Sequence, residues 1–316
     1  MAIKLGSTNF SSLYLGSVKI GEAYLGSVKV FGSSGPNYNP LNLPPFTMRL
    51  QFTEGVTPTF ITYVDGITYT QVSSSPNVWD VRYYDTTWFC PIYSTSRNDL
   101  IALLGANPTS YVRETRYMFA NCESLTSVAL FDTSSITDMD SMFANCSSLT
   151  TIPAFPTGNA TDMRGMFNDC TSLNSVPLLD TSHVTTFISM FSGCSSLTTV
   201  PQFNTSSATD MSSMFMNCTH LESVPLFDTS SVTDMACMFN YCVRLKSIPL
   251  FDTSACRDMY TMFDSCWKVE SGALALYNQA SAQSPAVTRH TYCFRNCGAD
   301  TTTGAAELAQ IGTGWK

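Results

Sequence analysis

Charged residues are scarce in this sequence. Of its 316 residues only 13% are Asp, Glu, Lys or Arg, and the 24 acidic residues outnumber the 16 basic residues, which gives a net charge of −8. A negative chain repels a phosphate backbone, whereas nucleic-acid-binding proteins gather basic side chains on one face. The composition therefore argues against nucleic acid as a partner.

Long apolar runs and histidine patterns are also missing. No stretch approaches the roughly 20 apolar residues that cross a bilayer, and the first residues lack the continuous apolar core of an export signal. We therefore expect no membrane insertion, and assembly in the cytoplasm. His183, His220 and His290 stand in no metal-ligand or nucleophile pattern, and no glycine-rich phosphate loop precedes an expected helix. The sequence predicts no catalytic residue, no metal site and no cofactor.

What the sequence has instead is a strict repeat. Leu follows the cysteine of each unit by three residues, Val or Ile comes three residues later, and a proline and Asp-Thr-Ser usually come next. A fixed period of this length is typical of a solenoid, in which each unit buries its apolar face against its neighbours. The motif Met-Phe-x-x-Cys returns every 24 residues, with its cysteine at Cys122, Cys146, Cys170, Cys194, Cys218, Cys242 and Cys266.

Two periodicities follow one another within each unit. The Leu-x-x-Val segment indicates a short strand. The run before the cysteine has apolar residues three or four apart, as in Val232, Met235, Met238, Phe239 and Cys242, which indicates one face of a helical turn. The cysteines are expected to be buried and mostly reduced, because equivalent positions of adjacent units share an apolar environment; occasional disulfides or metal are the alternatives.

The repeat resembles a known family. Cys-x-x-Leu-x-x-Val-Pro, followed by Asp-Thr-Ser-x-Val-Thr-Asp-Met and Met-Phe-x-x-Cys, is similar to the BspA-like leucine-rich repeats of bacterial surface proteins, which also occur in structural proteins of gut bacteriophages. The resemblance covers about half of the chain. It implies an α+β fold, a leucine-rich-repeat-like solenoid of 24-residue repeats with a strand plus a helical turn in each, and it says little about activity.

Residues 1–35 carry a smaller repeat, in which Leu-Gly-Ser recurs at ten-residue spacing and indicates short strands and turns. Such a segment cannot bury a core alone, so we expect it to dock on a larger assembly or on other copies of itself; a hairpin packed on the neighbouring domain is the alternative. It resembles the N-terminal segments of gut-phage virion proteins. That resemblance implies attachment to other virion proteins through Tyr14, Leu15, Gly16, Tyr24, Leu25 and Gly26.

The other segments follow from composition. Residues 36–45 are a Pro/Gly linker. Residues 46–107 predict a small β-rich domain that ends in a helical turn from Asp99 to Leu104. Residues 108–266 are the solenoid. Residues 267–316 predict a C-terminal cap, which contains one degenerate repeat, a helix from Ser271 to Ala282, a last helical turn from Ala305 to Ile311, and Trp315 over the open end.

Candidate binding residues come from two places. Aromatic residues cluster in the β-rich domain, at Trp79, Tyr83, Tyr84 and Trp88, where they are either a glycan platform or the core of a small domain. The two positions after the repeat leucine are mostly small and polar, and they form either a binding face or an inert solvated surface. They include Thr150, Thr151, Asn174, Ser175, Thr198, Thr199, Glu222 and Lys246.

Aspartates recur in two columns. Such columns could bind Ca²⁺ between units, but Asp, Thr and Ser in this setting more often accept backbone N–H bonds and shape turns. The columns also lose members, at Pro156, Thr186 and Asn204. One column holds Asp132, Asp180, Asp228 and Asp252, and the other holds Asp138, Asp162, Asp210, Asp234 and Asp258.

Taken together, these features predict a non-enzymatic bacteriophage virion protein, attached to tail or capsid, whose solenoid projects to bind a host surface glycan or protein. Trimers are common in such parts, so a homo-oligomer is expected. The alternative is a bacterial cell-surface adhesin of the same repeat family. A glycan-active enzyme is a third reading, and it would require an acid and a base that face each other.

Overall fold

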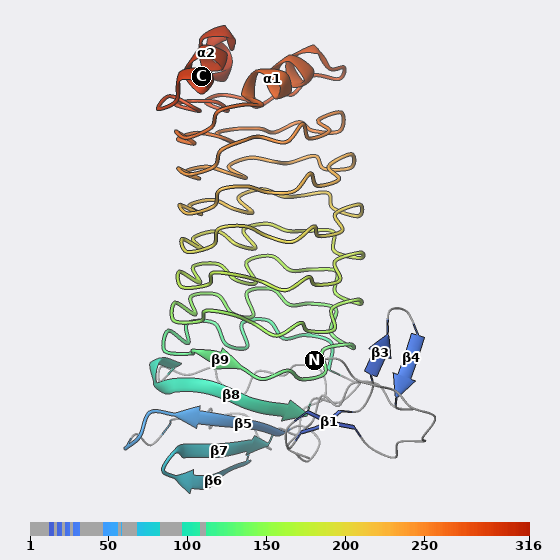
Figure 1. Cartoon of the computed structure of the whole chain (residues 1–316), viewed down its shortest axis with the longest axis vertical. Helices are drawn as coiled ribbons and strands as arrows, with labels where there is room; N and C mark the ends of the chain where they lie inside the picture. The colour runs from blue at the N-terminus through green and yellow to red at the C-terminus, as the bar shows by residue number, and fades with distance from the viewer. Residues whose placement is uncertain are drawn as a thin grey trace.

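A column of stacked coils dominates the structure, a computed structural model, with a mixed sheet at one end and two helices over the other (Figure 1). The structure describes residues 13–15, 18–20, 23–25, 28–31, 47–55, 58, 68–82, 97–107 and 112–316. The strands are β1 (Leu13–Leu15), β2 (Val18–Ile20), β3 (Ala23–Leu25), β4 (Val28–Phe31), β5 (Thr47–Phe52), β6 (Thr68–Ser74), β7 (Asn77–Arg82), β8 (Leu100–Asn107) and β9 (Ser127–Val128). The helices are η1 (Arg97–Asp99), α1 (Ala273–Ala282), α2 (Thr302–Gln310) and η2 (Thr313–Trp315).

The N-terminal repeat forms two antiparallel hairpins. β1 pairs with β2 so that Tyr14 lies opposite Lys19, and β3 pairs with β4 so that Tyr24 lies opposite Lys29. Each ten-residue unit of the sequence repeat therefore forms one antiparallel pair of strands. Gly16 and Gly26 lie outside the described residues.

The β-rich segment is not separated from the repeats. Its sheet has the order β6-β7-β5-β8-β9, and β8 pairs in parallel with β9, which belongs to the first coil. One apolar core runs from Met48 in β5 through the coils to Trp315. The helical turn predicted from Asp99 to Leu104 was wrong, because β8 is a central strand whose apolar residues are buried between two partners and so lack simple alternation.

The predicted helical turn of each repeat was also wrong. Met-Phe-x-x-Cys forms successive tight turns, as in the bonds from Met142 N to Met139 O (3.2 Å) and from Cys146 N to Phe143 O (3.1 Å). Two residues of each coil have a left-handed backbone, which cannot continue a right-handed helix. In the coil that ends at Cys146 they are Ser141 (φ 53°) and Asn145 (φ 60°), and in the next they are Gly165 and Asp169.

Proline explains why only the first coil has a regular strand among residues 112–271. In that coil the residue after Val128 is Ala129, whose N–H donates to Leu103 O of β8 at 2.8 Å. The next five coils carry Pro153, Pro177, Pro201, Pro225 and Pro249 at this position. Proline has no N–H to donate, so the ladder is interrupted after the Leu-x-x-Val segment in each of them.

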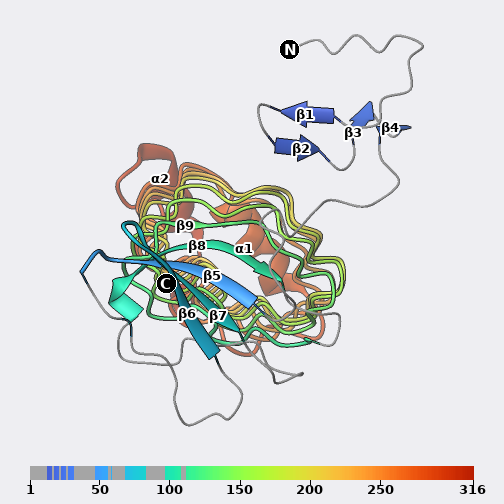
Figure 2. The same ribbon diagram turned by 90° about the horizontal axis from the view of Figure 1, so that it is seen from below.

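Threonine hydroxyls tie each coil to the next. In one column the Oγ1 atom donates at 2.8 Å to a carbonyl 23 residues ahead, as Thr181 does to Asn204. In a second column Oγ1 donates at 3.1 to 3.3 Å to a carbonyl 24 residues back, as Thr185 does to Thr161. Viewed along the stack, the coils therefore superimpose closely (Figure 2). The ten threonines of these two columns therefore join the coils to one another.

The cysteines are part of the same bonding. Each cysteine of the Met-Phe-x-x-Cys motif from Cys146 to Cys266 donates through Sγ, at 3.0 or 3.1 Å, to the carbonyl of a phenylalanine 27 residues back, as Cys194 does to Phe167. The cysteines of the described residues are free. Burial raises the pKa of the Cys170 thiol to about 12 and that of Cys194 well above its ordinary value. These groups remain neutral thiols, which are poor nucleophiles.

The C-terminal cap matches its prediction closely. α1 lies within the expected 271–282 and α2 contains most of the expected 305–311. Gly272 precedes α1 with φ 100°, and a Cβ there would lie 2.2 Å from Ile248 O, so this position requires glycine. Trp315 is 8% exposed and stacks on His290 at 4.2 Å, covering the last phenylalanine of the core, Phe294.

Candidate functional site

The polar face predicted after the repeat leucine lies on the surface. Among its candidate residues Thr150, Thr151, Asn174, Ser175, Thr198, Thr199 and Lys246 are exposed, and Glu222 is half-exposed. Backbone bonds join successive coils here, such as Asn174 N to Thr150 O at 3.2 Å. Lys246 Nζ and Glu222 Oε2 form an ion pair at 2.5 Å, so these two charges neutralise each other.

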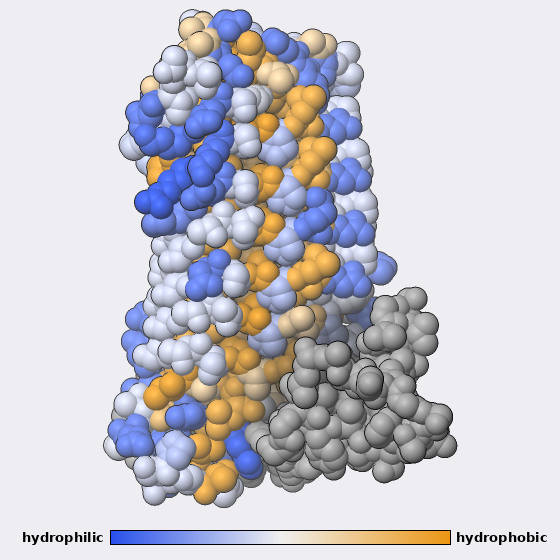
Figure 3. All heavy atoms as spheres, in the orientation of Figure 1, coloured by the Kyte–Doolittle hydropathy of each residue, from blue (hydrophilic) through white to orange (hydrophobic). Residues whose placement is uncertain are grey.

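An apolar stripe lies beside this polar face. It runs along the length of the stack in Figure 3, between the pale hydroxyl residues and the hydrophilic edge of the stack, which we call the turn edge. Its outermost side chains are Leu178, Leu226 and Leu250, which are 64%, 58% and 54% exposed. Each follows a half-buried proline and a Val or Ile that packs toward the core. Singly exposed leucines are ordinary on protein surfaces, but leucines that line up on one face of the stack make that face a candidate interaction surface.

Over its first five coils the stripe has a two-coil period that the sequence analysis missed, and Leu250, only 24 residues after Leu226, ends that period. Leu130, Leu178 and Leu226 are 48 residues apart, and the coils between them carry Ala154 and Gln202 at this position. Adjacent coils are about 4.8 Å apart, so these leucines recur at roughly 10 Å. The signal was present in the segments Val-Pro-Leu and Ile-Pro-Ala or Val-Pro-Gln, but the 24-residue cysteine pattern concealed it.

The aspartate columns shape turns, as the sequence predicted. In both columns each carboxylate accepts, through Oδ1, the backbone N–H two residues ahead at 2.8 to 3.1 Å. Where asparagine replaces aspartate, Asn204 Oδ1 also accepts from Ser206 N, at 3.1 Å, so the turn keeps this hydrogen bond. Across the residues that the structure describes, no group of three or more His, Cys, Asp or Glu side chains could hold a metal ion.

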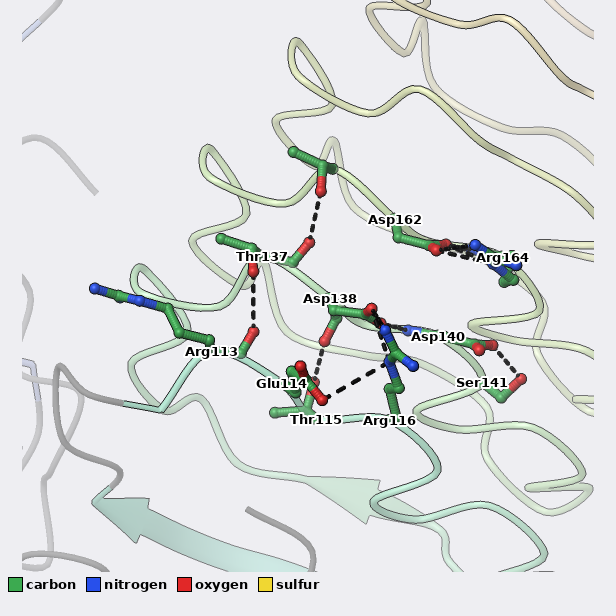
Figure 4. Close-up of polar contacts among 11 residues, drawn as sticks. Arg113, Glu114, Thr115, Arg116, Thr137, Asp138, Asp140, Ser141, Asp162 and Arg164 are labelled. Atoms are coloured by element: carbon green, nitrogen blue, oxygen red, sulfur yellow. Dashed lines mark hydrogen bonds and ion pairs between the residues drawn. The ribbon is translucent and has the colours of Figure 1, made fainter. Parts of the chain in front are cut away.

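Charges gather on the first coils, where Figure 4 shows them paired. Arg116 holds Asp138 with Nη2 at 2.5 Å, and Arg164 holds Asp162 at 2.5 Å. Asp140 accepts from Ser141 Oγ at 2.7 Å, and burial, with smaller contributions from Asp162 and Asp138, raises its pKa. Because the neighbouring carboxylates are bound to arginines and to backbone N–H groups, this cluster stabilises the coils rather than presenting a free acid and base.

Asp234 lies in the middle of the second column and gives a test of its electrostatics. Burial raises the pKa of Asp234, and the charges of Asp210 and Asp258 add to the effect. The folded state therefore disfavours the ionised form at neutral pH.

We expect Asp234→Asn, which keeps the Oδ1 acceptor for Ala236 N, to raise the free energy of unfolding at pH 7. The gain should be about 0.5 kcal/mol, because solvent screens the charge of this partly exposed side chain. The gain should shrink as pH falls through the raised pKa toward 3.8, the ordinary value. Urea unfolding at several pH values measures it.

Asp228→Asn is the matched control. The side-chain and backbone hydrogen bonds of Ser230 lower the pKa of Asp228, so the folded state favours its ionised form. This variant should lose a little stability at pH 7, and that loss should disappear as pH falls below the ordinary value of 3.8. If both variants changed stability in the same direction at pH 7, repulsion within the second column would not be the cause.

The repeats identify the family. A family described as "Mycoplasma protein of unknown function, DUF285" matches residues 96–198 and 175–274, which together cover more than half of the chain. The chain belongs to the DUF285 family. Both matches lie in β8 and the stacked coils, so the repeats and their junction with the sheet are what the family shares with this chain. No curated protein matches the sequence.

Two solved structures are similar to this DUF285 chain. One is a leucine-rich repeat protein from Eubacterium ventriosum, 23% identical, aligned over 52% of this chain and 39% of its own with a TM-score of 0.35. The other is a leucine rich cell surface protein from Faecalibacterium prausnitzii, 16% identical, aligned over 82% of this chain and 98% of its own with a TM-score of 0.21. The DUF285 chain thus spans about two fifths of the first protein. Neither is described as a bacteriophage protein.

The aromatic candidates of the β-rich segment do not form a described platform. Trp79 is partly buried in β7 against the core of the DUF285 chain, and its Nε1 donates to Asn77 Oδ1 at 2.8 Å. This placement favours the core interpretation for Trp79. Tyr83, Tyr84 and Trp88 lie outside the described residues. No helix in the described part of the chain is long and apolar enough to span a membrane.

Proposed function

We propose that this protein is a non-enzymatic recognition protein of the cell-surface adhesin type, whose repeat solenoid binds a protein on another surface through the leucine stripe. The stripe carries this proposal. It combines exposed Leu178, Leu226 and Leu250 with the hydroxyl residues beside it, where Lys246 and Glu222 are paired with each other. Such a face can bury apolar area and form neutral hydrogen bonds at once, which is the composition of protein interfaces.

Shape supports the same conclusion. The coils are held by hydroxyl and thiol hydrogen bonds at every step, so the stripe is rigid and binding would order few side chains. Leu130, Leu178 and Leu226 recur at a two-coil spacing with Ala154 and Gln202 between them, so apolar side chains alternate there with a small and a polar residue that a complementary protein surface can match. Gln202 Nε2 donates to Leu226 O at 2.9 Å, which fixes the Gln202 side chain against the next coil.

Labelled protein and a panel of intact bacterial and epithelial cells test this function. We expect binding that protease treatment of the cells removes, and a loss of about tenfold or more in Leu178→Ser/Leu226→Ser/Leu250→Ser, because central apolar contacts dominate interface energies. Ser134→Ala/Ser254→Ala, on the turn edge, is the control and should bind normally. Binding that survives protease but not periodate would point to glycan instead, and undiminished binding by the triple variant would refute the stripe.

The virion protein remains a second candidate because of the tandem hairpins. β1–β2 and β3–β4 are two copies of one small unit that pair Tyr14 with Lys19 and Tyr24 with Lys29 in the same way, as expected of a segment that docks on repeated sites of a larger assembly. Fractionation of a source culture, read by mass spectrometry, separates the candidates. The chain in the cell envelope supports the adhesin, and the chain in purified phage particles supports the virion protein. Recovery in the cytosol alone contradicts both.

A further inference from the structure

Exposed tyrosines collect at the C-terminal end of the stack. Tyr241, Tyr260 and Tyr292 are 45%, 37% and 40% exposed and lie within the last coils. The equivalent positions of the middle coils carry small or polar residues such as Asn217, Ala236 and Ser213. The repeat does not require aromatic residues here, since its middle coils form the same turns without them. We call these three residues the tyrosine patch.

Two arginines hold the rings of the patch. The Arg295 guanidinium lies over the Tyr292 ring at 4.6 Å, and the Arg289 guanidinium lies over the Tyr260 ring at 5.4 Å. The pKa of Arg295 is raised, chiefly by its hydrogen bonds to Asp264, and to a smaller degree by Tyr241 and Tyr292. The backbone N–H of Tyr241 donates to Asp264 O at 2.9 Å, and that of Ser265 donates to Arg295 O at 2.8 Å, so the coils that carry Tyr241, Asp264 and Arg295 are consecutive in the stack.

Each arginine is in turn fixed by a buried carboxylate. Asp264 is 1% exposed and accepts from both Nε and Nη2 of Arg295. Asp258 is 8% exposed, accepts from Nη1 of Arg289, and also receives the backbone N–H of Tyr260 at 2.9 Å. The same series of contacts, from carboxylate to guanidinium to tyrosine ring, therefore occurs twice. The rings of Tyr260 and Tyr292 are held in place before any ligand arrives, which lowers the entropic cost of binding.

We infer that the tyrosine patch is a binding site for neutral carbohydrate. Flat aromatic rings with a polar hydroxyl suit the apolar C–H faces and the hydroxyl groups of a pyranose. The two arginine charges are balanced by the two aspartates, so the patch has no excess cation to favour phosphate, sulfate or uronic acid. This site is separate from the leucine stripe, and it does not depend on the function proposed for the stripe.

A glycan array with hexasaccharides of glucose, mannose and N-acetylglucosamine, and with heparin as the acidic contrast, tests the inference on the full chain. The protein should bind at least one neutral hexasaccharide in preference to heparin. Tyr241→Ala/Tyr292→Ala should weaken that binding by about tenfold or more. Tyr117→Ala is the matched control: Tyr117 occupies the position of Tyr292 in the first coil, with φ 55° against 59°, and is 46% exposed. It should bind normally.

Two further variants keep the outcome clear. Tyr241→Phe/Tyr292→Phe retains the rings and should retain more binding than the alanine pair, which a merely structural defect would not produce. The stripe variant Leu178→Ser/Leu226→Ser/Leu250→Ser should bind the hexasaccharide normally, so failure of the stripe and failure of the patch are distinguishable. Binding of heparin alone, no binding of any neutral hexasaccharide, or full binding by the alanine pair with an unchanged unfolding temperature would each overturn the inference.

Discussion

Phe191→Ala should cost about 4 kcal/mol of unfolding free energy, the largest effect we expect from a single substitution in this chain. Phe191 is fully buried at the centre of a ring column, 5.5 Å from Phe167 and 5.6 Å from Phe215, and 5.9 Å from Phe203 of a second column. Removing the ring leaves a cavity among three stacked rings. Coils fixed by hydrogen bonds at every step cannot collapse to fill it, so the cost should lie in the upper part of the usual range.

Urea unfolding measures the loss, and two variants bracket it. Phe191→Leu keeps most of the volume and should cost about 1.5 kcal/mol. Leu226→Ala removes an exposed side chain from the same stack and should cost less than about 0.5 kcal/mol. A cost for Phe191→Ala as small as that of Leu226→Ala would contradict a close-packed ring column.

The stack also predicts where the loss appears. Each coil contacts only its neighbours, so the free energy of unfolding is nearly the sum of contributions from single coils and from the interfaces between adjacent coils. Amide hydrogen exchange in Phe191→Ala should therefore rise most in the coils around residues 167–215, and less near α1 and the sheet. A uniform rise across the chain would show that the column unfolds as one unit.

Arg295→Ala should cost about 3 kcal/mol, because it leaves the Asp264 carboxylate buried without its cation. Asp264 is 1% exposed, and its side chain also accepts from the Ser265 hydroxyl at 3.0 Å. Truncating one member of a buried ion pair imposes the desolvation penalty of the other. Thermal and urea unfolding of the variant measure the cost.

Two comparisons isolate the buried charge as the cause. Arg164→Ala removes an arginine from a more exposed pair with Asp162 and should cost less than about 1 kcal/mol. Adding Asp264→Asn to Arg295→Ala should restore about 1 to 2 kcal/mol, since the amide is neutral and still accepts from Ser265. If the double variant were less stable than Arg295→Ala, the loss would come from packing of the guanidinium on Tyr292 instead.

The sequence predicted the period, the core residues and the cap, because each rests on a pattern that burial imposes. Met, Phe, Leu and Cys recur at positions that are all buried, and Trp315 could serve few roles other than closing the stack. The turn role of the aspartates followed from the chemistry of a short carboxylate beside a backbone N–H. These are local or strictly periodic features, which one chain displays by itself.

The errors arose where two structures share one pattern. Apolar residues three or four apart suit a helix, but they also suit successive turns, and the deciding signal was the residue before each cysteine. Asn121, Asn145, Asp169, Gly193 and Asn217 are the residue types that tolerate a left-handed backbone. The β8 strand was mistaken for a helical turn because a central strand has no polar face.

The tyrosine patch could not be predicted from the sequence for a different reason. Tyr241, Tyr260 and Tyr292 occupy three different positions of the unit, and only the stacking of coils brings them to one surface. Their arginines come from residues 289 and 295, beyond the last regular repeat. The break in spacing after Cys266 hid the fact that these side chains continue the same columns.

The alternation of Leu178 with Ala154 and Gln202 bears on how such chains can change length. Gain or loss of one 24-residue unit would preserve every turn, ring and thiol, and the column would still fold. Between residues 130 and 226, where leucines alternate with Ala154 and Gln202, it would also place two leucines on adjacent coils, as Leu226 and Leu250 already lie, or two of the other residues, and it would shift every later leucine relative to the partner. Homologues that keep the same partner should therefore differ by pairs of units, and lineages that differ by a single unit should have changed what they bind.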